Sequence, residues 1–335
     1  MRKNYLYILC PLVMLVFTSC SNSNLLLSPS SGRPYEVLVV ADQACWDSIA
    51  GRSLIKVLRS DPVGLPLHES SFHFMYSPSQ HFDGELKYVR SIIMVKIDSK
   101  YSKSQMKMQH NPFASPQCML TIESPDQNDF SSFVEAQSKQ IISTLSDFEM
   151  NSKIAALQKE HSGIVANAVS SSFGGCEVFV PRELHDVKVG KDFLWASTGT
   201  PAVNQNFVMY SYPIDAHSVD SSYFIAKRDS VMRVNIPGHV KGTYMTTEPI
   251  GLIVGDKNKG RQEVCGLWRM KGDFMGGPFT SQVYFNDSQH KIYVVEVFVY
   301  APDRPKGNLL RSLSASLFTL KMPGAQVSTT NKDKN

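Results

Sequence analysis

The chain has 335 residues, of which 42% are hydrophobic and 19% are charged, and its formal net charge is +4. This balance is typical of a folded protein and excludes a disordered chain, while the length allows one large or two modest domains. The charge falls to +2 without Arg2 and Lys3, which is too weak to indicate a nucleic-acid partner, so none is predicted.

The N-terminal residues carry an export signal. Arg2 and Lys3 precede an apolar run of about 13 residues, 5–17, which is too short for a permanent membrane-spanning helix. Phe-Thr-Ser-Cys at 17–20 resembles a bacterial lipobox, and this implies removal of 1–19 and attachment of lipid, such as palmitate, to Cys20. The alternative is an ordinary secretory signal with an incidental cysteine. Residues 20–33 are rich in Ser, Asn, Pro and Gly and predict a flexible tether.

A first module is predicted over residues 34–165. Its apolar and β-branched pattern predicts a buried strand at 35–40, a helix at 45–59, and strands at 71–76, 91–97 and 117–123. A long helix follows over 128–160, with a break expected near Phe148.

A second module is predicted over 166–323. It begins with a β segment at 177–195 and continues with a strand, a helix, three strands and a last helix, at 206–212, 219–234, 264–270, 279–285, 292–300 and 306–320. The two halves share this order of elements. The predicted fold class is therefore α+β, with two similar modules of mostly antiparallel sheet and helices packed on one face. Residues 324–335 are polar and predict a disordered tail.

Four cysteines would remain in the processed chain besides Cys20, namely Cys45, Cys118, Cys176 and Cys265. They have neither CxxC nor metal-ligand spacing, so no metal site and no cofactor is predicted. An oxidising compartment would permit one or two disulfides. Buried, unpaired thiols are the preferred prediction.

The densest local signal is GDFMGGPFTS at 272–281. Its glycines could bring backbone amides close to a ligand and Asp273 could accept hydrogen bonds, so a ligand or partner loop is a candidate. The residues proposed for it are Trp268, Asp273, Gly276, Gly277 and Pro278. The alternative is a tight connection between strands, with Gly276 and Gly277 at positive φ.

Other polar pairs do not define a catalytic site, and no catalytic residue is predicted. His68 and Glu69 lie side by side in the sequence, but such pairs arise by chance in a chain with nine histidines. HExxH and GxSxG motifs are absent from the sequence. Lys227, Arg228 and Arg233 could contact an acidic partner or form a solvated helix face.

Several blocks together resemble a known family. They are LPLHESSF (65–72), YVRSIIMV (88–95), FASPQCMLTIESPD (113–126), DFLW (192–195), IPGHVKGTYMTTE (236–248), GLWRMKGDFMGGPFTS (266–281) and FVYAPDRPKG (298–307). In this order they resemble bacterial lipoproteins common in the Bacteroidota and known only as a domain of unknown function. The chain departs from that family at LPLHE, where LPQxE is expected, at RSI, where RNI is usual, and at Cys265, where arginine is usual.

The resemblance implies an envelope lipoprotein but supplies no reaction, ligand or catalytic residue. The predicted function is non-enzymatic binding or envelope assembly on the periplasmic face of the outer membrane, with Cys20 as the lipid anchor and an envelope protein or glycan as partner. An envelope hydrolase acting on glycan or peptide through Asp273 is the alternative, and a scaffold with an exposed apolar patch is a third hypothesis.

Overall fold

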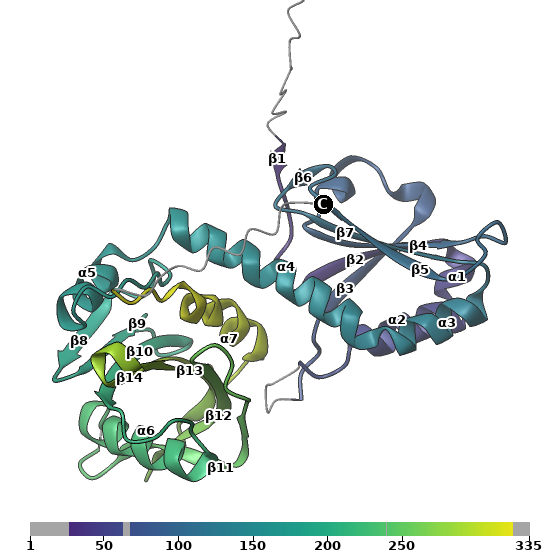
Figure 1. The fold of residues 1–335 in the computed structure, drawn as a ribbon. Coiled ribbons are helices and arrows are strands. Elements are labelled where there is room, and N and C mark those ends of the chain that lie inside the picture. The colour runs from purple at the N-terminus through teal and green to yellow at the C-terminus, as the bar shows by residue number, and fades with distance from the viewer. Residues whose placement is uncertain (1–26, 63–67, 239, 324–335) are drawn as a thin grey trace, which may run out of the picture.

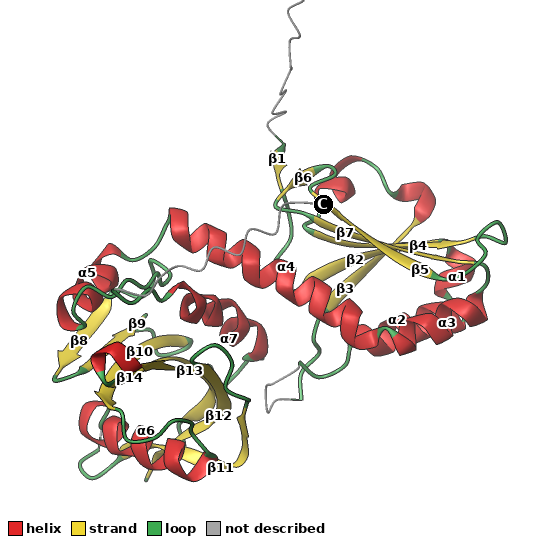
Figure 2. Cartoon of the chain, viewed as in Figure 1, coloured by secondary structure: helices red, strands yellow, loops and turns green. Residues whose placement is uncertain are grey.

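The structure, a computed structural model, describes residues 27–62, 68–238 and 240–323. Its elements form a five-stranded sheet near the N-terminus and a seven-stranded sheet near the C-terminus, with helices packed on both (Figure 1). The predicted α+β class is confirmed. The long helix α4, Ser138–Lys159, extends from the first sheet toward the second (Figures 1 and 2).

The N-terminal sheet has the strand order β3-β2-β4-β7-β5. These strands are β2 (Glu36–Ala41), β3 (His73–Pro78), β4 (Ser91–Ile97), β5 (Gln105–His110) and β7 (Cys118–Ser124). Strands β3, β2, β4 and β7 run parallel to one another and only β5 is antiparallel, so the expectation of mostly antiparallel pairing is wrong here. The reason lies in the connections, which are long enough to return the chain to the same end of the sheet.

Helices cover one face of this sheet. They are α1 (Gln43–Trp46), α2 (Ile49–Leu58), α3 (Gln127–Ala136) and α4. The helix break lies at Gln137 and not near Phe148, because Phe148 is buried in the core inside α4. Phe82, Leu86 and Phe113 cover the other face, near the 3₁₀ turns η1 (Ser79–His81) and η2 (Gly84–Tyr88).

The C-terminal sheet has the order β11-β12-β13-β14-β10-β9-β8, and all neighbouring strands are antiparallel. The strands are β8 (Asp186–Gly190), β9 (Phe193–Ser197), β10 (Asn204–Pro213), β11 (Tyr244–Val254), β12 (Arg261–Lys271), β13 (Gly276–Asn286) and β14 (Lys291–Tyr300). The antiparallel expectation holds for this sheet. It curls strongly (Figure 2).

Helices pack on both faces of the C-terminal sheet, whereas one face was expected. One face contacts α6 (Ser221–Asn235), and the other contacts α5 (Gly163–Ser172), α7 (Gly307–Ser314) and the 3₁₀ turn η4 (Ala315–Thr319). A further 3₁₀ turn, η3 (Asp287–Gln289), joins β13 to β14. Strand number, strand direction and helix placement therefore differ between the two sheets, and they are not similar modules.

Part of the expected tether packs against the fold. β1 (Ser28–Pro29) pairs with β6 (Ala114–Ser115), and Ser31 pairs with Val89. A flexible tether is therefore wrong for residues 28–31, because their backbone groups find partners in the N-terminal part. Cys20, the rest of the tether up to residue 26, the signal peptide 1–19 and the tail 324–335 lie outside the described residues.

The four remaining cysteines are buried and unpaired, which confirms the preferred prediction. No helix within 27–62, 68–238 and 240–323 is long and apolar enough to cross a membrane.

Candidate functional site

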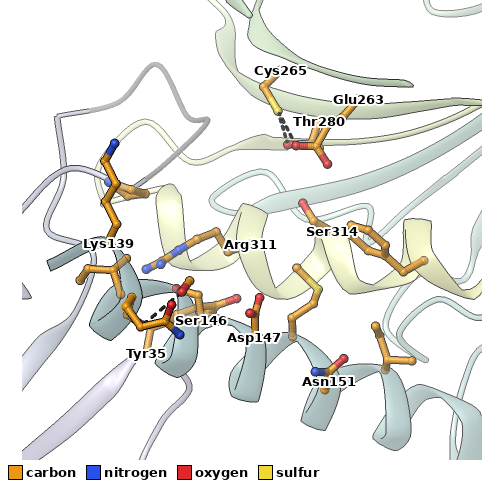
Figure 3. A pocket seen from close by; sticks show the side chains of 17 residues that line it. Tyr35, Lys139, Ser146, Asp147, Asn151, Glu263, Cys265, Thr280, Arg311 and Ser314 are labelled. Carbon is orange, nitrogen blue, oxygen red and sulfur yellow. Dashed lines mark hydrogen bonds between the residues drawn. The ribbon is translucent and has the colours of Figure 1, made fainter. Parts of the chain in front are cut away.

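A cleft of about 770 Å³ lies between α4 on one side and α7, η4, β12 and β13 on the other (Figure 3). We call it the α4–α7 cleft. Its volume falls within the range of about 300–1,000 Å³ that is usual for ligand sites. Its lining combines apolar and polar side chains: Tyr35, Pro62, Lys139, Gln140, Ile142, Ser143, Ser146, Asp147, Met150, Asn151, Ile154, Glu263, Cys265, Thr280, Arg311, Ser314 and Phe318.

The floor of the cleft is one face of α4. Ser143, Asp147, Met150 and Ile154 recur at intervals of three and four residues, so they lie on one side of the helix. Buried residues at other positions of the same helix, Ile141, Leu145 and Phe148, pack into the N-terminal core. One face of α4 therefore packs in the N-terminal core, and another lines the cleft.

The opposite wall includes Glu263 and Cys265 of β12 and Thr280 of β13. Cys265 pairs across the strands with Thr280, and its thiol donates to Thr280 Oγ1 at 3.7 Å and to Glu263 Oε1 at 3.8 Å. Burial raises the pKa of Cys265 to about 12, so the thiol stays protonated and is a poor nucleophile at neutral pH. Position 265, where the resembled family usually has arginine, thus lies on the cleft wall.

Arg311 of α7 supplies the positive charge at one end of the cleft (Figure 3). Its Nη2 donates to the Ser71 carbonyl and to Asn308 Oδ1, and its Cζ lies 3.7 Å from the centre of the Tyr35 ring. Its Nε is buried and has no hydrogen-bond partner among the described residues. Arg311 is half-buried, and desolvation lowers the pKa of its guanidinium.

Tyr35, which also lines the cleft, has an uncommon backbone conformation. Its φ of 62° lies in the left-handed region, although it is a bulky residue and is only 2% exposed. Burial raises the pKa of its hydroxyl to about 12. Such strain persists only where the surrounding packing over-determines the conformation, and it often accompanies binding sites.

Glu69 joins the two parts of the chain beside the cleft. Its carboxylate accepts hydrogen bonds from the backbone N–H groups of Lys306, at 2.9 Å, and Gly307, at 2.7 Å, at the start of α7. A Cβ at Gly307 would lie 2.8 Å from Glu69 Oε2, so glycine permits the approach. In the sequence, Glu69 stands out only as one half of a chance His-Glu pair, because its partner Gly307 lies 238 residues away.

The predicted ligand loop is a β-hairpin, and none of its candidate residues lines the cleft. Trp268 is 3% exposed and packs edge-to-face on Phe298 at 5.3 Å. Gly276, Gly277 and Pro278 open β13. A Cβ at Gly277 would lie 2.1 Å from the Val299 carbonyl.

Two details of that hairpin differ from expectation. The positive φ occurs at Gly272, at 86°, and not at Gly276 or Gly277, which are in strand β13 and pack closely against neighbouring backbone. Asp273 lies in the exposed turn, where its carboxylate accepts a hydrogen bond from the Phe274 amide at 2.6 Å. Across the described part of the chain, no second titratable side chain is bonded to Asp273.

Arg228 was expected at a partner contact or on a solvated helix face, and both expectations are wrong. It is fully buried between α6 and β14, where Nε and Nη2 donate to the Glu296 carboxylate at 2.9 and 2.7 Å. Ser281 donates to the same carboxylate at 2.8 Å. This network lies in the core under the curled sheet and outside the cleft, so we assign it to stability.

Two family models match consecutive parts of the chain. "Domain of unknown function (DUF8532)" matches residues 30–158, and "Domain of unknown function (DUF4837)" matches residues 164–319. The chain thus carries two segments that each match an uncharacterised domain family. No curated protein matches it.

The comparison with solved structures gives a distant likeness. A point mutant of the protein Mog1 has 9% sequence identity to this chain and a TM-score of 0.31. The match covers 44% of this chain and 92% of the Mog1 chain. The Saccharomyces cerevisiae Ran-binding protein Mog1p has 10% sequence identity and a TM-score of 0.31, and that match covers 44% of this chain and 91% of the Mog1p chain.

Proposed function

We propose that this protein is a lipid-anchored envelope protein that binds a ligand, without transforming it, in the α4–α7 cleft. The observation that carries the binding function is the cleft itself. It lies between two parts of the chain, and it combines apolar surface with charged and hydrogen-bonding groups. This is the usual composition of a site that binds and orients a small molecule or a short segment of a partner.

The titratable side chains in the cleft favour binding over catalysis. They are Lys139, Asp147, Glu263, Cys265 and Arg311. Within the described residues, the one hydrogen bond among these five side chains joins the Cys265 thiol to Glu263, and the raised pKa of that thiol works against nucleophilic attack. The hydrolase alternative at Asp273 has less support, because that carboxylate lies on an exposed turn away from the cleft.

Ligand binding in the cleft can be tested by blocking the cleft with a bulky side chain. Ser143 is an exposed residue of α4 that lines the cleft, and Gln158 is an exposed residue of the same helix outside it. We expect the lipidated protein, purified from envelopes, to retain a ligand that Ser143→Trp loses and Gln158→Trp keeps, measured by mass spectrometry of the released material. Equal retention in both variants would place binding elsewhere and refute the proposal.

The proposed lipid anchor is supported by the sequence alone, because Cys20 lies outside the described residues. We expect Cys20→Ala to move the protein from the detergent phase to the aqueous phase in phase partitioning, and to remove the lipid mass from its N-terminal peptide. Placement on the periplasmic face of the outer membrane predicts protection from protease in intact cells. Digestion in intact cells would overturn that placement.

A further inference from the structure

We infer that the ligand of the α4–α7 cleft is a short peptide whose carboxylate pairs with Arg311. This inference rests on the proposed binding function and names the chemical class of the ligand. Its starting point is a guanidinium that lines a cleft and has no carboxylate partner among the described residues.

The Arg311 guanidinium has hydrogen-bond donors without a partner among the described residues. Nη2 makes two hydrogen bonds with the chain, whereas Nε and Nη1 make none with the described residues. The nearby Glu69 directs its two carboxylate oxygens at backbone N–H groups of the α7 start and makes no hydrogen bond with Arg311 among the described residues. Residues 63–67, VGLPL, which lie outside the described part of the chain, include no acidic residue. An arginine with a buried Nε that has no partner among the described residues normally has a carboxylate or phosphate partner.

The guanidinium is also held in place before any ligand arrives. It stacks over Tyr35 at 3.7 Å and lies 5.6 Å from the Phe72 ring centre, while the Ser71 carbonyl fixes one end. A fixed planar fork suits two parallel hydrogen bonds to a carboxylate, and little side-chain entropy is lost on binding. Lys139 reaches toward the same end of the cleft (Figure 3).

The rest of the cleft fits a peptide better than an acyl chain. Its lining includes apolar residues such as Ile142, Met150 and Phe318 together with hydroxyl and amide groups such as Ser146 and Asn151. An acyl chain would leave those polar groups unpaired, whereas a peptide backbone offers them partners at regular spacing. The α4 floor from 139 to 154 is about 22 Å long, which an extended peptide of about six residues would cover.

The test uses two pools of N-acetylated hexapeptides built from non-acidic residues, one with free C-terminal carboxylates and one with C-terminal amides. The full lipidated protein in detergent is offered both pools, and retained peptides are identified by mass spectrometry. We expect retention from the acid pool alone. This comparison needs no variant, so it does not depend on whether a substituted protein folds.

Variants then assign the carboxylate to Arg311. For a retained peptide, we expect Arg311→Lys to weaken binding about 10- to 100-fold, the effect of losing charge-assisted hydrogen bonds. The exposed Lys139→Gln should weaken it less, and Lys153→Gln, on the same helix outside the cleft, should not change it. An unchanged affinity in Arg311→Lys would overturn the assignment.

The two proposals fail in different ways. Equal retention of acids and amides, sensitive to Ser143→Trp, overturns the carboxylate inference and leaves cleft binding intact. Retention of neither pool, while envelope material still binds in a Ser143→Trp-sensitive manner, overturns the peptide class only. Insensitivity of all binding to Ser143→Trp overturns the proposed function as well.

Discussion

Replacing Glu296 by glutamine should sharply destabilise the C-terminal part of the protein. Both Arg228 and Glu296 have fully buried side chains, and their two hydrogen bonds of 2.9 and 2.7 Å form a bidentate pair. Glu296→Gln keeps the volume but removes the one fully buried counter-charge of Arg228, because the remaining carboxylate, Asp229, lies 3.9 Å from Nη1 and is partly exposed. Breaking one side of a buried pair costs about 3–5 kcal/mol, because the remaining charge stays desolvated. Phe279, whose ring centre is 4.3 Å from Arg228 Cζ, can offset only part of this loss.

Urea unfolding followed by tryptophan fluorescence measures this cost. Of the three tryptophans, Trp195 and Trp268 are in the C-terminal sheet and Trp46 is in the N-terminal part. A Trp46→Phe background therefore makes the fluorescence report on the C-terminal sheet alone. The matched control is Glu248→Gln, because Glu248 pairs with Arg269, whose side chain is 58% exposed.

The control should cost less than about 1 kcal/mol, as exposed ion pairs do. If Glu296→Gln costs no more than Glu248→Gln, the argument from a desolvated cation is wrong. The paired replacement Arg228→Met with Glu296→Leu removes both charges, and we expect it to be more stable than Glu296→Gln alone. A paired variant less stable than the single one would also contradict the reasoning.

Three further predictions concern the contacts that hold the fold together. Glu69→Gln should lower the free energy of unfolding in urea by about 1–2 kcal/mol, because a charged acceptor at the start of α7 is lost; an unchanged value would contradict the contact. Gly277→Ala should reduce the melting temperature strongly, since its Cβ would lie 2.1 Å from a backbone oxygen, whereas Phe274→Ser at the fully exposed turn should leave it unchanged. Burial raises the pKa of Cys265 from 9.0 to about 12, so above about pH 9 the unfolded chain loses a proton that the folded chain keeps. Stability in urea should therefore fall as pH rises from about 9 to about 12, and less so in Cys265→Ser.

Strand positions in the core could be predicted because the apolar pattern records burial directly. The continuous apolar run in β2 reflects a strand buried on both faces, and β14 is likewise buried on both faces although Glu296 interrupts its apolar run. Strand direction could not be predicted in this way. The pattern of β2, β4 and β7 is the same for parallel and antiparallel pairing, and the choice depends on connections whose paths become visible only in the fold.

Some elements were missed because their sequences lack a strong pattern. β5, QMKMQH, is an exposed edge strand, so it has no continuous apolar run. β11 contains Pro249 and Gly251 and has a register shift between Glu248 and Ile253, which interrupts the alternation expected of a strand. Edge strands pair on one side only, and they can therefore tolerate such sequences.

The candidate site could not be predicted because its residues meet only in three dimensions. Arg311 contacts the Ser71 carbonyl across 240 positions, and Glu69 contacts Gly307 across 238. A helix prediction for α4 is correct in type, but it cannot tell that one face contacts the core while another faces a cleft. The sequence pointed instead to the glycine-rich hairpin, because close backbone packing and ligand binding both require glycine.

The contacts of Glu69 and Gly277 join several of the sequence blocks that carry the family resemblance. Residues 298–307 meet the 266–281 block where Gly277 packs against Val299, and they meet residues 68–72 where Glu69 binds the start of α7. These blocks therefore hold the architecture together. The α4 face of the cleft, residues 139–154, belongs to none of them, and Ser143, Asp147 and Asn151 on that face are exposed. Substitutions at these exposed positions should cost little stability. If the proposed binding function holds, they would change which ligand the cleft binds while the fold stays the same.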